Sequence, residues 1–268
     1  MFDEAHCIMR WGHSFRPAYL HAIKLVKDLR NRGFWIPIAM FSATLPDVEL
    51  KNLMNELGVE KYVVLDLNLH SFNINEVLPN TPRVLKGPIL RENIDISGVK
   101  LQSPEIRPKI LVNVVKELVN WSEKYSNGKP WIGIVFTGFV KSSRKEENVE
   151  YLAKLLSEKL GEKVVAFHGQ LSREEKEKVL EALYRVSRGE AKEPRIVVAT
   201  KAFGMGVDIP NIRWIVHYMM SESIEDYYQE IERGGRDGEM AKAALLYVDG
   251  YDYLRRAKLI KSQILNNQ

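Results

Sequence analysis

From about residue 100 onward, hydrophobic positions alternate between helical spacing and short uninterrupted runs. Apolar side chains recur every three or four positions over residues 110–119, which predicts a helix that Asn127 and Gly128 then end. Runs typical of buried strands occupy residues 131–136, 163–167, 195–199, 212–217 and 243–248. Because helical patterns separate most of these runs, we predict a doubly wound α/β domain with a parallel sheet of at least five strands.

Two serine–glutamate pairs have the spacing of a capping box, in which both side chains bind amides at the start of a helix. Ser143 with Glu146 precedes an apolar helical stripe, and Ser172 with Glu175 precedes a highly charged one. We predict that each pair opens a helix. A fourth helix is predicted over residues 222–231, between the last two strands.

The N-terminal third contains fewer strand patterns. Residues 38–42 and 62–65 are the two good candidates, each next to a helical pattern. Residues 67–105 are rich in proline and weakly periodic, so we expect the connection between two lobes there. The expected organisation is an incomplete first lobe over residues 1–92 and a complete second lobe over residues 93–268.

Composition adds little to this organisation. The net charge of +4 is compatible with a polyanionic partner but too small to identify one. Cys7 is the only cysteine, which excludes an internal disulfide and makes a reducing, cytoplasmic compartment the default expectation. No apolar stretch approaches the roughly 18 residues of a membrane span, and no signal peptide is visible, so no membrane partner is expected.

Two adjacent carboxylates, Asp3 and Glu4, follow Phe2 at the start of the chain. At the end of a strand beside a nucleotide, one such carboxylate can hold Mg²⁺ through water while the next orients or deprotonates the attacking water. Acidic pairs are also common at helix N-termini, where they stabilise the helix dipole. The pair alone leaves both interpretations open.

The longer stretch over residues 3–19, DEAHCIMRWGHSFRPAY, closely resembles motif II and the aromatic-rich loop of RecQ-family helicases. The resemblance implies RecA-like helicase lobes, ATP and Mg²⁺ as cofactors, Asp3 as the metal-binding carboxylate and Glu4 as a catalytic one. It implies DNA-binding or coupling roles for His6, Trp11, His13, Phe15 and Arg16. Aromatic rings and an arginine can grip a strand without reading its sequence. Trp11 and Phe15 can alternatively be core residues.

Further motifs of the same family follow. Residues 41–45, FSATL, resemble motif III, which implies that Ser42 and Thr44 link the nucleotide site to the DNA site. Such hydroxyls also serve as plain helix caps.

Residues 134–137, IVFT, resemble motif IV and imply a DNA-coupling role for Thr137. His168 follows a strand, as in relatives whose equivalent turn touches the DNA backbone. A buried, hydrogen-bonded imidazole is the alternative.

Residues 198–210, VATKAFGMGVDIP, resemble motif V. Its glycines allow backbone amides to approach a phosphate closely. The resemblance implies that Thr200 lies near DNA and that Gly206 and Asp208 contribute to nucleotide binding, with Asp208 near the ribose. RecQ proteins often have asparagine at the position of Asp208.

Residues 228–238, YQEIERGGRDG, resemble motif VI. The resemblance implies that Gln229 binds nucleotide, that Arg236 is the arginine finger and that Arg233 acts beside it. Two arginines at this spacing can neutralise charge on a phosphate in the transition state, although arginines at a helix C-terminus also stabilise the dipole. Glu232 occupies a position where the family normally has glycine, and its carboxylate can pair with an arginine and weaken the finger.

A motor of this class also needs a glycine-rich loop ending in Gly-Lys-Ser or Gly-Lys-Thr, and this sequence contains none. We therefore expect part of a DNA helicase that unwinds strands when another polypeptide supplies the missing motifs, with single-stranded or partly duplex DNA as substrate. The chain alone is expected to be inactive. The alternative is a non-catalytic module that binds nucleic acid or a protein partner.

Overall fold

The computed structural model describes residues 2, 5, 17–34, 36–42, 45, 47–59, 61–66, 83–86, 91–142, 144–204 and 207–254. The chain divides into two compact units, residues 1–90 and residues 91–268. Each unit is considered by itself. None of the described helices is both long and apolar enough to cross a membrane.

Among its described residues, the first unit has two helices and a short parallel sheet. Its elements are α2 (Pro17–Asn31), α3 (Asp47–Glu56), β1 (Val63–Asp66) and β2 (Arg83–Lys86). Strands β1 and β2 pair in parallel, and a small core forms around Ile23, Leu53 and Leu57. The strand predicted over residues 38–42 is wrong. This segment pairs with the start of the chain through backbone hydrogen bonds of Ala39 and Phe41 with Phe2 and Ala5, but its one described bridge, between Phe2 and Met40, is isolated and does not extend into a strand.

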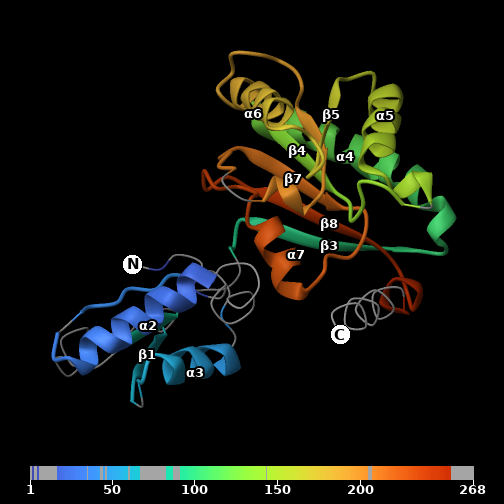
Figure 1. Ribbon diagram of the computed structural model, residues 1–268. Helices are drawn as coiled ribbons and strands as arrows, with labels where there is room; N and C mark the ends of the chain where they lie inside the picture. The colour runs from blue at the N-terminus through green and yellow to red at the C-terminus, as the bar shows by residue number, and fades with distance from the viewer. Residues whose placement is uncertain are drawn as a thin grey trace. The chain divides into compact units, whose positions relative to one another are not determined.

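The second unit is built on a six-stranded parallel sheet in the order β3-β8-β7-β4-β6-β5 (Figure 1). The strands are β3 (Ile94–Leu101), β4 (Ile132–Phe136), β5 (Val164–Phe167), β6 (Ile196–Ala199), β7 (Ile212–His217) and β8 (Ala241–Val248). The helices are α4 (Arg107–Ser126), α5 (Val149–Leu160), α6 (Arg173–Ser187) and α7 (Ile224–Ile231), with 3₁₀ turns η2 (Pro104–Ile106), η3 (Lys145–Glu147) and η4 (Lys201–Phe203). The predicted doubly wound parallel sheet is confirmed.

Helices cover both faces of this sheet because successive strand side chains point to opposite sides. On one face α4 and α5 pack against side chains such as Val135 and Trp214. On the other face α6 packs against Ile134 and Val197, and α7 packs against Ala243 of β8. Every residue of β4, β6 and β7 is buried, as expected for central strands covered by helices.

The one strand of this sheet that the sequence did not predict is β3, which lies within the expected connection over residues 67–105. It forms one edge of the sheet, pairs with β8 alone, and most of its side chains are exposed. An exposed edge strand needs no continuous apolar run, so the hydrophobic pattern that identified the other strands is missing here. Strand β2 lies in the same segment and was missed as well.

The two predicted capping boxes have different outcomes. Ser172 and Glu175 form the complete capping box of α6, with hydrogen bonds of 3.2 Å and 2.7 Å between each side chain and the other's backbone amide. The prediction for Glu146 is wrong, because η3 occupies this stretch and α5 begins at Val149 after Asn148. Its proposed partner Ser143 lies outside the described residues.

Candidate functional site

Three of the residues predicted to bind DNA or to couple to it lie at one edge of the sheet in the second unit. Thr137, His168 and Thr200 follow directly after β4, β5 and β6, which are neighbouring strands. Backbone hydrogen bonds join Thr137 to Ala199 at 2.9 Å and Thr200 to Phe167 at 3.0 Å. Because the carboxyl ends of parallel strands meet at one edge, the three residues come together at the edge where open α/β sheets bind ligands.

The side chains of these three residues are buried and bonded within the unit. The Thr137 hydroxyl donates to the carbonyl oxygen of Glu147 at 2.8 Å. The Thr200 hydroxyl accepts from the amide of Ala202 at 3.4 Å and caps η4. The His168 Nε2 atom lies 2.8 Å from the carboxylate of Glu150 on α5. These side chains therefore hold the loops at the carboxyl edge in place.

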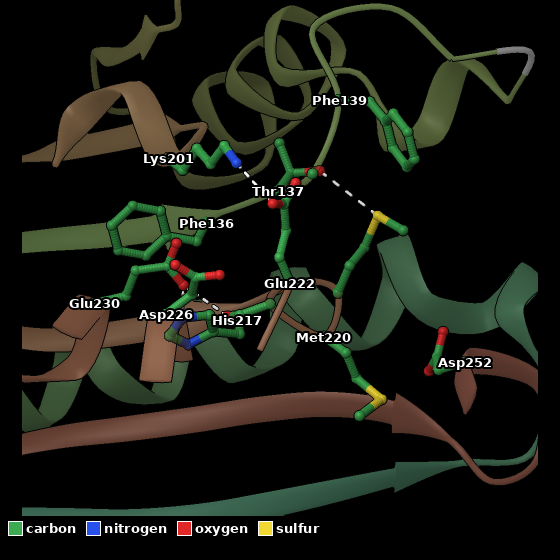
Figure 2. A pocket seen from close by; sticks show the side chains of 13 residues that line it. Phe136, Thr137, Phe139, Lys201, His217, Met220, Glu222, Asp226, Glu230 and Asp252 are labelled. Carbon is green, nitrogen blue, oxygen red and sulfur yellow. Dashed lines mark hydrogen bonds and ion pairs between the residues drawn. The ribbon is translucent and has the colours of Figure 1, made fainter. Parts of the chain in front are cut away.

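A cavity of about 180 Å³ lies at the same edge, between the ends of β4 and β7 (Figure 2). Its acidic lining residues are Glu222, Asp226, Glu230 and Asp252. His217 ends β7, is almost fully buried, and places Nε2 2.9 Å from the carboxylate of Glu230. The Lys201 ammonium group lies 2.6 Å from the carboxylate of Glu222. Sequence reasoning missed His217 and Lys201, although His217 ends β7 and Lys201 is the second residue after β6, both at the carboxyl edge.

The residues predicted to bind nucleotide form a second cluster in the same unit. Arg236 Nη1 lies 2.7 Å from Asp208 Oδ1, in a pair whose side chains are 32% and 80% exposed, respectively. A Cβ atom added to Gly204 would lie 3.4 Å from Arg233 Nη2. The segments that resemble motifs V and VI are therefore in contact. Gln229 is half-buried on α7, one turn before Arg233.

Glu232 makes a different contact from the one expected of it. Its Oε1 atom accepts a hydrogen bond of 2.7 Å from the hydroxyl of Tyr228, one helical turn earlier. Burial, together with this carboxylate, raises the pKa of the Tyr228 hydroxyl. The carboxylate that pairs with the candidate finger Arg236 is instead that of Asp208.

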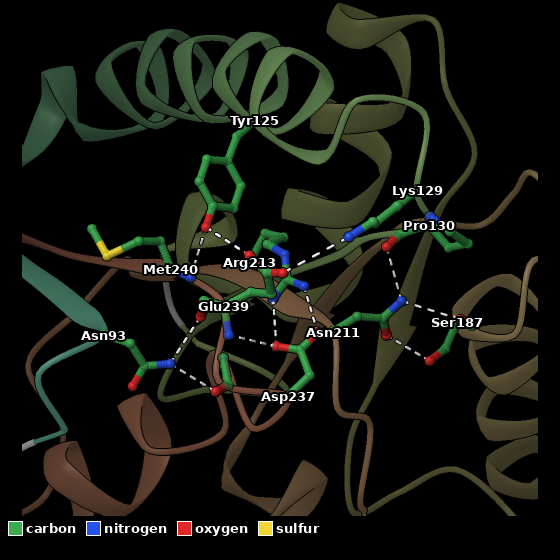
Figure 3. A network of polar contacts seen from close by, with 11 residues as sticks. Asn93, Tyr125, Lys129, Pro130, Ser187, Asn211, Arg213, Asp237, Glu239 and Met240 are labelled. Atoms are coloured by element: carbon green, nitrogen blue, oxygen red, sulfur yellow. Dashed lines mark hydrogen bonds and ion pairs between the residues drawn. The ribbon is translucent and has the colours of Figure 1, made fainter.

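The turn that carries Arg236 is part of a polar network (Figure 3). Arg213, at the start of β7, donates two hydrogen bonds to Asp237, of 3.0 Å and 2.5 Å. Burial raises the pKa of Asp237, but the hydrogen bonds and charge of Arg213, together with backbone hydrogen bonds, outweigh it, so the pKa lies below its ordinary value. Tyr125 of α4 donates to the Glu239 carboxylate at 2.9 Å. The backbone next to Arg236 is therefore held from several directions.

Several predicted site residues lie outside the described part of the chain. They are Asp3, Glu4, His6, Trp11, His13, Phe15, Arg16, Thr44 and Gly206. Ser42 is described and is half-buried in the segment that bonds to Phe2. Within the described ranges, no group of three or more histidine, cysteine or acidic side chains is arranged to hold a metal ion. The predicted Mg²⁺ ligand Asp3 is not among those residues.

Comparison with known proteins identifies the class to which the second unit belongs. Residues 111–238 match the family model described as the helicase conserved C-terminal domain. Among solved structures, Mss116p bound to ssRNA and AMP-PNP covers 97% of this chain and 45% of its own, with a TM-score of 0.60 at 18% identity. A Saccharomyces cerevisiae Dbp5 variant bound to RNA and ADP BeF₃ covers 97% and 55%, with a TM-score of 0.62 at 17% identity. These likenesses show the fold, which is RecA-like and shared with DEAD-box helicases.

Sequence relatives narrow the class further. The chain is 28% identical over 264 residues to a RecQ-like DNA helicase BLM of Xenopus laevis, and 30% identical over 262 residues to an ATP-dependent DNA helicase RecQ of Pasteurella multocida. These alignments cover 98% and 97% of the chain, but only 16% and 34% of the respective relatives. The chain belongs to the RecQ-type helicases of superfamily two and corresponds to a C-terminal part of their helicase region.

Proposed function

We propose that this chain supplies the second lobe of an ATP-dependent DNA helicase, in which Arg233 and Arg236 act on the phosphates of ATP and the carboxyl edge of the sheet holds a DNA strand. The observation that carries the proposal is the meeting of two motifs in one unit. Arg236 contacts Asp208, and Arg233 lies beside Gly204. Two cationic side chains are thereby gathered next to a glycine-containing loop in a chain of the RecQ type.

The described residues suit a nucleotide. Guanidinium groups match the charge and geometry of phosphate oxygens, and the side chain of Arg236 is one-third exposed, so it can exchange Asp208 for a phosphate. The Asp208 carboxylate can then accept a hydrogen bond from a ribose hydroxyl. In this proposal Arg236 neutralises charge that develops on the transferred phosphoryl group, Arg233 supports it, and Gln229 contacts the nucleotide. ATP with Mg²⁺ supplies the phosphoanhydride bond that is cleaved.

The acidic residues near the start of the chain complete this proposal from the sequence alone. Asp3 would hold Mg²⁺ through water and Glu4 would orient or deprotonate the attacking water. His6, Ser42 and Thr44 would couple the nucleotide to DNA. Single-stranded DNA would contact the loop bearing Trp11, His13, Phe15 and Arg16, where aromatic stacking makes binding independent of sequence.

At the carboxyl edge, the proposed DNA contact depends on loops that the buried threonines hold. The Thr137 and Thr200 hydroxyls are bonded within the unit, so they fix the loops after β4 and β6. Lys201, the next residue after Thr200, is 65% exposed and paired with Glu222. A DNA phosphate can replace that carboxylate, which makes binding at this edge dependent on salt. The turn at His168 lies beside these loops.

The test is DNA-stimulated ATP hydrolysis by the purified chain, alone and mixed with a polypeptide that supplies the phosphate-binding loop. We expect hydrolysis only in the mixture, and its loss in either Glu4→Gln or Arg236→Ala. Arg188→Ala is the matched control, since it removes an exposed arginine that pairs with Glu190 on another part of the unit. DNA binding without hydrolysis in any such mixture would support a non-catalytic binding module instead.

A further inference from the structure

Asn93, just before β3, reaches the turn that carries Arg236. Its Nδ2 atom donates hydrogen bonds to the carbonyl oxygens of Gly235 and Glu239, each of 2.8 Å (Figure 3). The backbone carbonyl oxygen of Asn93 accepts a hydrogen bond of 2.8 Å from the backbone amide of Ala241. One side-chain amide therefore bridges two carbonyls that flank Arg236 in the sequence.

The turn is closely packed around this amide. Gly235 has a φ of +59°, and a Cβ atom added there would lie 2.5 Å from Asn93 Nδ2 and 2.4 Å from the carbonyl oxygen of Glu239. Only glycine fits this combination of positive φ and close approach. The space that a larger residue would occupy is therefore filled by the Asn93 amide.

The chemistry of the site requires two N–H donors on one short side chain. Asn93 supplies both from a single planar group, and each donor satisfies one carbonyl. An aspartate in its place would have the same shape but would bring carboxylate oxygens against two carbonyl oxygens. An alanine would remove both hydrogen bonds and leave a gap. Shape and hydrogen bonding can thus be separated by substitution at this one position.

The position of the Arg236 guanidinium depends on the backbone beneath it. Its partner Asp208 is largely exposed, and an exposed ion pair holds a side chain only weakly. The neighbouring residue Asp237 is fixed by Arg213, but that contact does not join Gly235 to Glu239. The Asn93 amide makes this link.

We propose that Asn93 is a positioning residue for Arg236, holding the turn over residues 235–239 so that the guanidinium is presented to a bound phosphate. The inference rests on the proposed role of Arg236 in ATP hydrolysis. Asn93 is the third residue of the second unit, so the same contact ties the chain that enters this unit to the arginine turn. The contact spans 142 residues of sequence.

The first test measures the turn itself and does not depend on ATP hydrolysis. Residue-resolved hydrogen exchange is compared in the full chain, in Asn93→Ala and in the nearly isosteric Asn93→Asp. We expect the Gly238 amide, which donates to Gly235, to exchange about tenfold faster or more in both variants, while amides of β4 keep their protection. Ser97→Ala is the matched control, because Ser97 follows on β3 and donates to Ala243 outside the turn. Unchanged exchange in the turn would overturn the inference.

The second test separates positioning from simple stabilisation. In the mixture that hydrolyses ATP, Asn93→Ala should lower kcat about tenfold while KM for ATP changes by less than about twofold. In the background of Arg236→Lys, which keeps the positive charge and a measurable rate, Asn93→Ala should cause a much smaller loss than in the unsubstituted chain, because it acts through that arginine. Independent, multiplicative losses, or an equal loss in Ser97→Ala, would overturn the inference. If the unsubstituted mixture hydrolyses no ATP, the proposed function fails, and the exchange measurement alone decides for or against the role of Asn93 in the turn.

Discussion

Replacing Asp237 with asparagine should destabilise the second unit more than the same replacement of an exposed aspartate does. Asp237 receives two hydrogen bonds from Arg213, whose side chain is 5% exposed, while its own side chain is 27% exposed. The substitution keeps the shape of the residue but leaves the arginine buried without a negative partner. An unpaired buried charge is costly because the protein interior solvates it poorly.

The expected magnitude follows from the burial of the two partners. Removing one member of a fully buried ion pair costs about 3 to 5 kcal/mol. Asp237 is partly reached by water, and asparagine can still accept one hydrogen bond from Arg213, so we expect a loss of about 2 kcal/mol in the free energy of unfolding. In the surface pair of Lys100 with Asp249, both side chains are more than half exposed. Asp249→Asn should therefore leave the free energy of unfolding almost unchanged.

Urea unfolding followed by tryptophan fluorescence provides the assay. Trp131 and Trp214 are buried in the core of the second unit, so their emission reports on that unit. The midpoint should fall in Asp237→Asn with an unchanged slope, and should hardly move in Asp249→Asn. Equal midpoints for these two variants would refute the reasoning that the Arg213 contact is a buried, stabilising pair.

The pH dependence of the free energy of unfolding tests the same ion pair independently. The pKa of Asp237 is lower in the folded protein than its ordinary value, because the hydrogen bonds and charge of Arg213 and the backbone hydrogen bonds together outweigh burial. A carboxyl of this kind stabilises the fold above its unfolded pKa of about 3.9, and this stabilisation is lost as pH falls through the lower folded value. The stability difference between the unsubstituted chain and Asp237→Asn should be constant near neutrality and shrink below about pH 4.

Three further substitutions test other parts of the structure. Gly133→Ala would place a Cβ atom 2.0 Å from the ring of Trp214, so we expect a loss of about 3 kcal/mol or more, measured by urea unfolding. Asp252→Ala leaves buried Arg107 without the carboxylate that lies 2.6 Å from it, and should lower the free energy of unfolding by about 3 to 5 kcal/mol. A loss below about 1 kcal/mol would contradict the buried pair. Asp208→Asn should change stability by less than about 0.5 kcal/mol but raise tripolyphosphate affinity by up to about fivefold, measured by calorimetry at low salt, because it releases Arg236. A lower affinity in that variant would contradict the competition.

The central strands were predictable because their environment is simple. Strand β4 is buried on both faces, so its five residues form an uninterrupted apolar run. Strand β3 could not be found in this way, since Asp95, Ser97 and Lys100 interrupt its apolar residues and its place is set by pairing with β8. Hydrophobic patterns reveal burial, and an exposed edge strand has little of it.

Whether a capping-box spacing opens a helix also depends on the tertiary contacts that the same residues make. The pair at Ser172 and Glu175 caps α6, whereas Glu146 has the same spacing but lies in η3. In that loop the Glu147 carbonyl accepts from Thr137, and its carboxylate accepts from Ser142 at 2.7 Å. These two hydrogen bonds fix the segment next to the end of β4, and α5 begins only after it.

The predicted and the unpredicted parts of the site differ in how far apart in the sequence the contacting residues lie. The placement of Thr137 and Thr200 at one edge follows from their positions after parallel strands. The contacts that hold the arginine turn do not follow from any local pattern, because Asn93 lies 142 residues from Gly235 and Arg213 lies 24 residues from Asp237. Such partners are known only once the sheet brings β3, β7 and β8 side by side.

The two departures from the family pattern near the arginines have opposite consequences. Glu232 bonds to Tyr228 on its own helix, so its carboxylate is engaged away from the candidate finger. Asp208, in the position where related proteins often have asparagine, is the residue that pairs with Arg236, and its backbone amide donates to the Tyr184 hydroxyl of α6 at 3.1 Å. The carboxylate is therefore anchored through its backbone while its side chain is exposed. A polyphosphate carries more negative charge than one carboxylate, so it can displace Asp208 from Arg236, and the strength of the finger depends on this competition.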